Sequence, residues 1–111
     1  MNWIYLQDEK QLDEIVANSN IIPQVIFKHS TRCATSSMAK NRLERNEAPA
    51  GVNFYFLDLI KHRNLSNKIA SEFGIRHESP QVLVINNGKC IYNESHSGIM
   101  FDEIESAAMQ K

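Results

Sequence analysis

The stretch NKIASEFGIRHESPQVLVINNGK, residues 67–89, carries the clearest signals for the fold. Its first part has apolar residues at helical spacing, and Gly74 follows as the type of residue that ends a helix. The apolar run QVLVI, residues 81–85, predicts a buried strand. Asn87-Gly88 is typical of a type I′ turn, so we predict that residues 90–95 return as a paired strand of a β-hairpin.

Strands and helices alternate along the rest of the chain. We expect further strands at residues 3–6, 24–28 and 52–59, and further helices at residues 8–18, 33–46, 64–73 and from residue 102 onward. The order β-α-β-α-β-α-β-β-α predicts an α/β fold with a central mixed sheet that ends in an antiparallel hairpin and has helices on both faces.

Helix ends and helix faces are suggested by single residues. Asp8 and Gln11 stand three apart, as in a capping box. Asn64 is expected to cap the helix that Gly74 ends. We expect Met38 and Leu43, together with the alanines, to form the apolar side of the helix at residues 33–46.

Composition and charge limit the classes of function. The chain has 111 residues, which fits one domain over residues 1–111, and its 12 basic and 13 acidic residues leave a net charge of −1. This balance does not favour a nucleic-acid or membrane surface as the main partner. No apolar run is long enough for a membrane span, and the N-terminus lacks a signal-peptide pattern, so we expect a cytoplasmic protein whose thiols stay reduced.

Cys33 lies at a chemically favourable position. It follows the strand at residues 24–28 by five positions and opens the next helix. Ligands gather at the carboxyl ends of strands in α/β sheets, and the free N–H groups at the start of a helix favour a thiolate. Arg32 adds a second positive charge if its side chain turns toward the sulfur. The polar residues on both sides favour a reactive thiol over a buried, inert one.

Ser36 stands where a Cys-x-x-Cys enzyme would have its second thiol. A hydroxyl group cannot form a disulfide, but it can donate a hydrogen bond to the Cys33 thiolate from one helical turn further on. Cys33 can therefore attack a disulfide and keep one half of it, and release then needs an outside thiol. This chemistry suits the removal of a small thiol from a protein.

The sequence resembles the thioredoxin superfamily over nearly its whole length. Residues 67–89 are similar to the segment that leads from the third helix through the cis-proline into the hairpin, with Pro80 at the cis-proline position and Ser79 before it. Gly98 lies before the last helix, where that superfamily has a glycine. The resemblance implies a thioredoxin-like fold and a cis Ser79–Pro80 bond, with the Ser79 backbone opposite the reactive sulfur and able to pair with an extended substrate.

Within that superfamily, HSTRCATSSMAKNRLE, residues 29–44, resembles the monothiol bacilliredoxins (YtxJ-type), which use bacillithiol as their small thiol. The serine three residues after the cysteine matches, whereas Ala34 replaces a common proline. The resemblance implies a cytosolic enzyme that removes bacillithiol from proteins, with bacillithiol as co-substrate, no bound cofactor, and bacillithiolated proteins as partners. It also implies two groups of site residues, catalytic Cys33, Ser36 and Arg32, and substrate-binding Thr31, Ser79, Pro80 and Gly98.

Three further residues bear on the chemistry of Cys33. Cys90 is either a half-buried strand residue, a resolving thiol for Cys33, or a link between two molecules. His29 precedes Cys33 by four positions, but one such pair is a weak metal signal, so we expect no metal site and a polar residue that tunes the thiol. The buried aspartate of thioredoxins aligns near Phe27, so we expect no buried acid below Cys33.

Two alternatives to a bacillithiol-removing enzyme remain open at this point. The first is a glutaredoxin-like monothiol enzyme that uses another small thiol. The second is a non-enzymatic thioredoxin-fold adaptor whose thiol is incidental.

Overall fold

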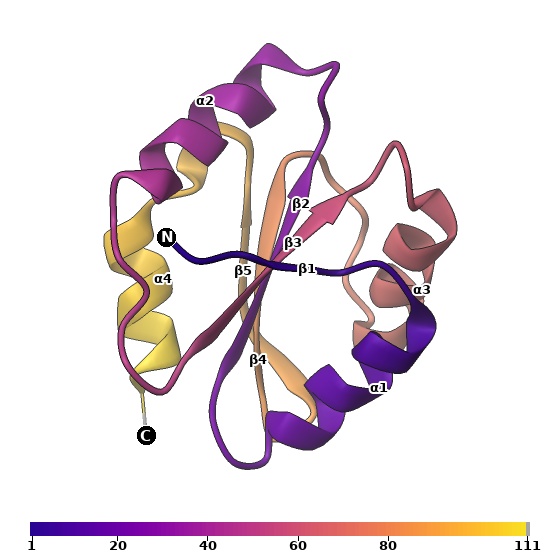
Figure 1. Cartoon of the computed structure of the whole chain (residues 1–111), viewed down its shortest axis with the longest axis vertical. Coiled ribbons are helices and arrows are strands. Elements are labelled where there is room, and N and C mark those ends of the chain that lie inside the picture. The colour runs from indigo at the N-terminus through magenta and orange to yellow at the C-terminus, as the bar shows by residue number, and fades with distance from the viewer. Residues whose placement is uncertain (111) are drawn as a thin grey trace.

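Five strands form one mixed sheet in the order β1-β3-β2-β4-β5 (Figure 1). The structure, a computed structural model, describes residues 1–110. The strands are β1 (Ile4–Tyr5), β2 (Gln24–His29), β3 (Asn53–Asp58), β4 (Gln81–Asn86) and β5 (Lys89–Ser95). The first three run parallel to one another, and β4 runs antiparallel to both β2 and β5. This is the mixed sheet with a terminal hairpin that the sequence predicts.

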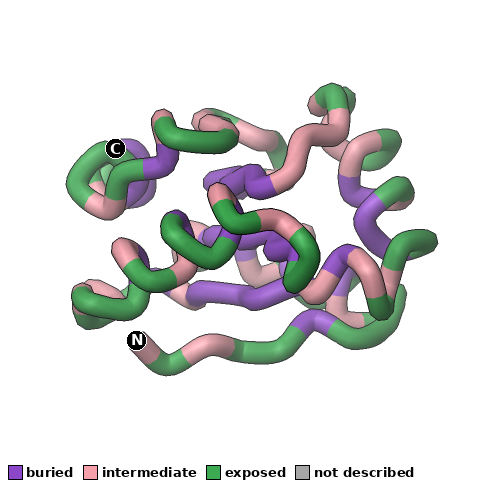
Figure 2. Tube along the Cα trace, turned by 90° about the horizontal axis from the view of Figure 1, so that it is seen from above, coloured by how far each residue is buried: buried purple, intermediate pink, exposed green. Residues whose placement is uncertain are grey.

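Helices cover both faces of the sheet. They are α1 (Glu9–Asn18), α2 (Ala34–Glu44), α3 (Arg63–Phe73) and α4 (Phe101–Ala108), with a short 3₁₀ helix, η1 (His96–Gly98), before α4. Figure 1 shows α2 and α4 on one face and α1 and α3 on the other. Each face has its own apolar cluster, and Figure 2 shows that the buried residues gather between these layers. The helices within residues 1–110 are all too short or too polar to cross a lipid bilayer.

Several local signals behave as the sequence predicts. Asp8 accepts a hydrogen bond from the Gln11 backbone N–H while the Gln11 side chain accepts from the Asp8 backbone N–H, which completes the capping box. Gly74 ends α3 with φ +64°. Asn87 and Gly88 both have positive φ, as a type I′ turn requires.

Two helix details differ from the prediction. Met38 is 61% exposed, because the buried side of α2 is formed by Ser36, Ala39 and Leu43, which are spaced three to four residues apart. The prediction that Asn64 caps α3 is also wrong, because the helix begins earlier, at Arg63. For α2, packing against the sheet buries Ala39 in place of its neighbour Met38.

The strand register defines two ends of the sheet. His29 at the end of β2 lies beside Asp58 at the end of β3, and Lys28 is paired with Gln81 at the start of β4. The segments that follow β2 and β3 and the segment that precedes β4 therefore emerge at the same end, which we call the carboxyl edge. The β4–β5 turn, at Asn87, lies at the opposite end, which we call the hairpin edge.

Candidate active site at the carboxyl edge

Cys33 is the N-cap residue of α2 and lies at the carboxyl edge. Its backbone is extended, its N–H donates to the Ser30 carbonyl at 3.2 Å, and its carbonyl accepts from the Ser37 N–H at 3.1 Å. The residue is half-buried, whereas Thr31 and Arg32 before it are exposed. The thiol is thus held at the positive end of a helix and is partly open to solvent, as a nucleophilic cysteine requires.

Ser36 is completely buried in the first turn of α2. Its Oγ lies 2.7 Å from Nδ1 of His29 and accepts a hydrogen bond from the Ser30 N–H at 3.0 Å. The sequence predicts that this hydroxyl donates to the thiolate, but here its contacts are with groups at the end of β2. Ser36 therefore ties the first turn of α2 to the strand that precedes Cys33.

His29 is the polar neighbour of this serine and is almost fully buried. Its ring packs against the rings of Phe27 and Phe56, with centroids 6.0 and 5.3 Å away. Burial, with a smaller effect of the Lys40 ammonium, holds the pKa of His29 below its usual range. The ring is therefore neutral at pH 7, and it either donates to or accepts from Ser36, depending on which nitrogen carries its proton.

The segment before β4 adds the second part of the site. The Ser79–Pro80 peptide bond is cis, which is the geometry that the resemblance implies. Pro80 is buried, and its carbonyl accepts from the His96 N–H at 3.0 Å. Nearby, Nε2 of His96 lies 3.1 Å from the exposed carboxylate of Glu78. The proline loop and η1 are thus joined at the carboxyl edge.

Gly98 ends η1 and lies close to the Glu94 side chain. A Cβ atom at this position would lie 2.7 Å from Cδ of Glu94, so any larger residue would have to displace that carboxylate. The carboxylate also accepts a hydrogen bond from the Ser95 N–H at 2.9 Å. A glycine here keeps the end of β5 close to the start of α4.

Lys28 is the residue at this edge that sequence reasoning missed. It is completely buried on the α1 and α3 face, where Nζ donates to the Ser66 carbonyl at 3.1 Å and lies 3.3 Å from Nδ1 of His77. Burial lowers the pKa of Lys28 from 10.5 to about 8. The sequence does show a lysine inside a strand whose other residues are apolar or uncharged. Its contact with His77 could not be predicted, because the two residues are 49 positions apart.

The structure places Cys90 out of reach of Cys33. Cys90 is paired with Ile85 near the hairpin edge, whereas Cys33 follows the far end of β2. A six-residue strand spans about 20 Å, and a disulfide needs Cα atoms within about 7 Å. Burial also raises the pKa of the Cys90 thiol, which donates to the Tyr92 carbonyl at 3.3 Å. In this fold Cys90 is therefore out of reach of Cys33, and it could resolve that thiol only after a rearrangement.

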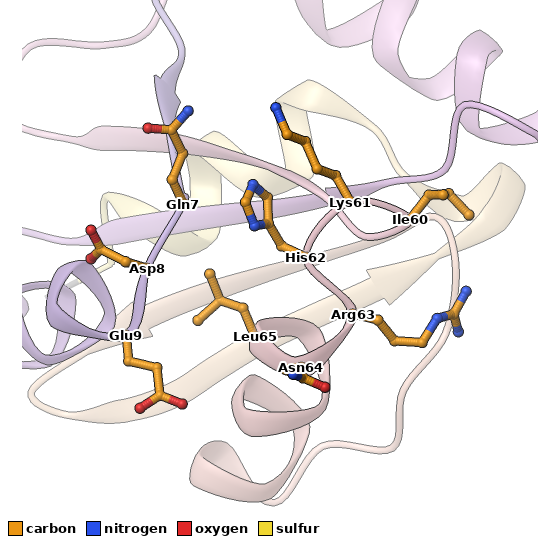
Figure 3. Close-up of a pocket in the computed structure, with 9 residues that line it drawn as sticks. All are labelled: Gln7, Asp8, Glu9, Ile60, Lys61, His62, Arg63, Asn64 and Leu65. Atoms are coloured by element: carbon orange, nitrogen blue, oxygen red, sulfur yellow. The ribbon is translucent and has the colours of Figure 1, made fainter.

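A cavity of about 480 Å³ lies beside the site rather than in it. It is lined by Gln7, Asp8 and Glu9 and by residues 60–65. Figure 3 shows Gln7, Lys61 and His62 extending to one side of this cavity and Glu9 extending to the other. Acidic and basic side chains are thus mixed around it. Within residues 1–110, no group of three or more His, Cys, Asp or Glu side chains is arranged to hold a metal ion.

Comparison with protein families matches residues 4–104 to the family described as monothiol bacilliredoxin BrxC. The chain belongs to this family. The match includes Cys33, Ser36 and Pro80 and extends from β1 into α4. The resemblance noted from residues 29–44 is therefore confirmed at the level of the family.

Solved structures agree on the fold. One protein described as an oxidoreductase with a thioredoxin fold is 26% identical, with a TM-score of 0.82 over 94% of this chain and 91% of the other. Thioredoxin from Malassezia sympodialis is 22% identical, with a TM-score of 0.73 over 98% and 90% of the two chains. Mitochondrial thioredoxin 3 from Saccharomyces cerevisiae is 14% identical, with a TM-score of 0.72 over 96% and 92%. This bacilliredoxin-family chain thus has a thioredoxin fold and a thiol oxidoreductase function.

Proposed function

We propose that this chain removes bacillithiol from protein mixed disulfides, with Cys33 as the nucleophile and bacillithiol as co-substrate. One arrangement carries the proposal: a single thiol caps α2 at the carboxyl edge, and the next position that could resolve it holds a buried serine. The family match supports the choice of small thiol. The proposed compartment is the reducing cytoplasm, where a lone thiol stays available.

The proposed reaction consists of two thiol–disulfide exchanges. The Cys33 thiolate attacks the bacillithiol sulfur, the protein–bacillithiol bond breaks, and the protein thiolate leaves and takes a proton from water. A second bacillithiol thiolate then attacks the bacillithiol sulfur held on Cys33. Bacillithiol disulfide forms and the Cys33 thiolate is released, so two electrons pass from bacillithiol to the protein disulfide.

Arg32 and Ser36 are proposed to assist Cys33 in different ways. Arg32 is exposed and precedes Cys33 directly in the chain, and its guanidinium group is proposed to turn toward the sulfur and pair with the thiolate. Ser36 is completely buried in the first turn of α2 and contacts His29. When His29 carries its proton on Nδ1 and donates to Ser36, the serine proton remains free to turn toward the sulfur. Ser36 thereby orients the start of α2, and it is proposed to donate to the thiolate as well.

Substrate docking is assigned to the loops around the thiol. Thr31 is exposed next to Arg32, and the Ser79–Pro80 segment emerges at the same edge. The Ser79 backbone is proposed to pair with an extended stretch of the substrate, as an added strand does. Gly98 lies at the same edge before α4, and it is proposed to belong to this docking surface, where a larger residue would displace the Glu94 carboxylate.

Release is proposed to depend on an external thiol, because Cys90 lies at the hairpin edge. A protein that carries one bacillithiol adduct, mixed with the chain, tests both steps by intact mass spectrometry. We expect the adduct to move to Cys33 and to leave it when free bacillithiol is added. Cys33→Ser is expected to slow the transfer by at least about 1,000-fold, whereas Cys90→Ser, the matched control, leaves it unchanged.

The same experiment separates the alternatives. A glutathionylated copy of the substrate protein that transfers its adduct faster would favour a glutaredoxin-like enzyme. Absence of any adduct on Cys33 would favour an adaptor. Removal of bacillithiol by Cys33→Ser at the wild-type rate would contradict the proposal outright.

A further inference from the structure

Lys28 is buried and has no acidic partner within residues 1–110. Its side chain is completely inaccessible, and within the described residues its hydrogen-bonding partners are the Ser66 carbonyl and the His77 ring. Transfer of a charged ammonium group into a protein interior is unfavourable, and an apolar side chain of similar size would fill the same space at lower cost. The position of this lysine therefore points to a role beyond packing.

The role follows from what Lys28 contacts. His77 lies in the loop of residues 76–80, three residues before Pro80, and its Nδ1 is 3.3 Å from the lysine Nζ. The Ser66 hydroxyl also lies 3.3 Å from Nδ1 of His77. Burial, together with the Lys28 ammonium, holds the pKa of His77 below its usual range, so Nδ1 is available as an acceptor.

Gln81 holds the same loop from the neighbouring strand. It is directly paired with Lys28 across β2 and β4, and it is almost fully buried. Its Nε2 donates to the Arg76 carbonyl at 2.9 Å. Two paired, buried polar residues thus hold the loop near its beginning, one through the ring of His77 and the other through the backbone of Arg76.

We propose that Lys28, with Gln81, is a positioning residue that fixes the loop of residues 76–80 so that the Ser79 backbone can dock an extended protein substrate. This inference rests on the proposed function, because it concerns how the substrate reaches Cys33. It predicts that Lys28 matters for disulfides carried by a polypeptide and not for small disulfides that reach the sulfur without docking.

Two reporters that lack bacillithiol test the proposal. The first is a cysteine peptide joined to 2-nitro-5-thiobenzoate, and the second is the small symmetrical disulfide of the same aromatic thiol. Both release a coloured thiolate when Cys33 attacks. We expect Lys28→Met to slow the reaction with the peptide by about tenfold and to leave the reaction with the small disulfide unchanged.

Variants of His77 provide the rescue. His77→Leu is expected to behave like Lys28→Met, because it removes the acceptor. His77→Asn is expected to restore most of the peptide rate, because its amide oxygen can accept near the position of Nδ1. Lys68→Met, which removes a half-buried lysine of α3 that pairs with Glu9 away from the loop of residues 76–80, is the matched control and should change neither rate.

Equal peptide rates for wild type and Lys28→Met would overturn the proposal, and so would an equal loss with both reporters, since the effect would then lie in the thiol or the fold. Failure of His77→Asn to differ from His77→Leu would also overturn it. Because neither reporter contains bacillithiol, a failure of the bacillithiol assignment leaves this comparison of rates intact.

Discussion

The hairpin edge and the carboxyl edge are built from similar residues but differ in how their polar groups are paired. At the hairpin edge, the buried Ser19 hydroxyl donates to the Val16 carbonyl at 2.6 Å and accepts from the Gly88 N–H at 2.8 Å. At the carboxyl edge, Ser79 Oγ and Gln81 Oε1 are buried without a partner among the described residues. Within residues 1–110, the buried side-chain polar atoms that lack a hydrogen-bond partner thus lie at the carboxyl edge.

The buried lysine and histidine side chains of residues 1–110 also lie at the carboxyl edge. Lys28 and His29 are consecutive at the carboxyl edge and point to opposite faces of the sheet, one toward His77 and the other toward Ser36. Proteins tend to depart from local rules at sites of function, and unpaired buried groups are expected there. The comparison teaches that the chemistry of this small fold is concentrated at one end, while the other end supplies stability.

The largest expected effect concerns the buried lysine. The pKa of Lys28 is about 8 in the folded protein and 10.5 when exposed, so the unfolded chain binds more protons between these pH values. The free energy of unfolding should therefore rise as pH increases from 8 to 10.5, by up to about 3 kcal/mol. Urea denaturation of wild type and Lys28→Met at several pH values measures this free energy. An equal dependence of the free energy of unfolding on pH in the two proteins would contradict the prediction.

The next effect separates the two thiols. Iodoacetamide should alkylate Cys33 about a hundredfold faster than Cys90, because burial raises the pKa of Cys90 and only thiolates react. Mass spectrometry of partially labelled protein gives both rates. Labelling in roughly 8 M urea is the control, because this concentration unfolds most small domains. In the unfolded chain the two thiols should be alkylated at similar rates. Equal rates in the native protein would break the contrast between the edges.

A smaller effect compares the two buried serines. Ser19→Ala leaves the Gly88 N–H without its partner, and Ser36→Ala does the same to the Ser30 N–H. Each change should lower the free energy of unfolding by about 1–2 kcal/mol. Only Ser36→Ala should also slow the reaction of Cys33, which an activity assay at matched folded fraction would show. A loss of activity in Ser19→Ala would contradict the prediction that only the carboxyl edge affects the reaction of Cys33.

The smallest effect compares two glycines. Gly88→Ala at φ +76° should cost about 1 kcal/mol through backbone strain, although the added methyl would lie 3.9 Å from Val16. Gly98→Ala should instead push the Glu94 carboxylate away from the Ser95 N–H and slow peptide docking more than it lowers stability. Thermal denaturation and the peptide reporter distinguish these outcomes. A larger loss of peptide rate in Gly88→Ala than in Gly98→Ala would refute the prediction.

Local signals made much of the fold predictable from the sequence. The capping box at Asp8, the glycine that ends α3 and the Asn87-Gly88 turn each depend on neighbours within a few residues. Cys33 at a helix start and Pro80 in a cis bond were also predictable, the latter through the family resemblance. These features need no knowledge of which surfaces meet in the folded chain.

The remaining features depend on distant contacts. Met38 and Ala39 are adjacent apolar residues, and only packing against the sheet decides which one is buried. The burial of Lys28 depends on His77, which is remote in sequence. Ser36 was correctly placed in the first turn of α2, but its contact with His29 depends on rotamers and on the exact end of β2.

Trp3 gives the molecule an optical reporter of its own. It is the chain's single tryptophan, its indole stacks on Phe27 with centroids 5.7 Å apart, and its Nε1 donates to Glu44 of α2 at 2.8 Å. Phe27 belongs to the strand that leads to Cys33, and Glu44 ends the helix that Cys33 caps. A shift of that helix when the sulfur becomes derivatised would alter the polarity around the indole, so native emission can follow single turnovers without an added label.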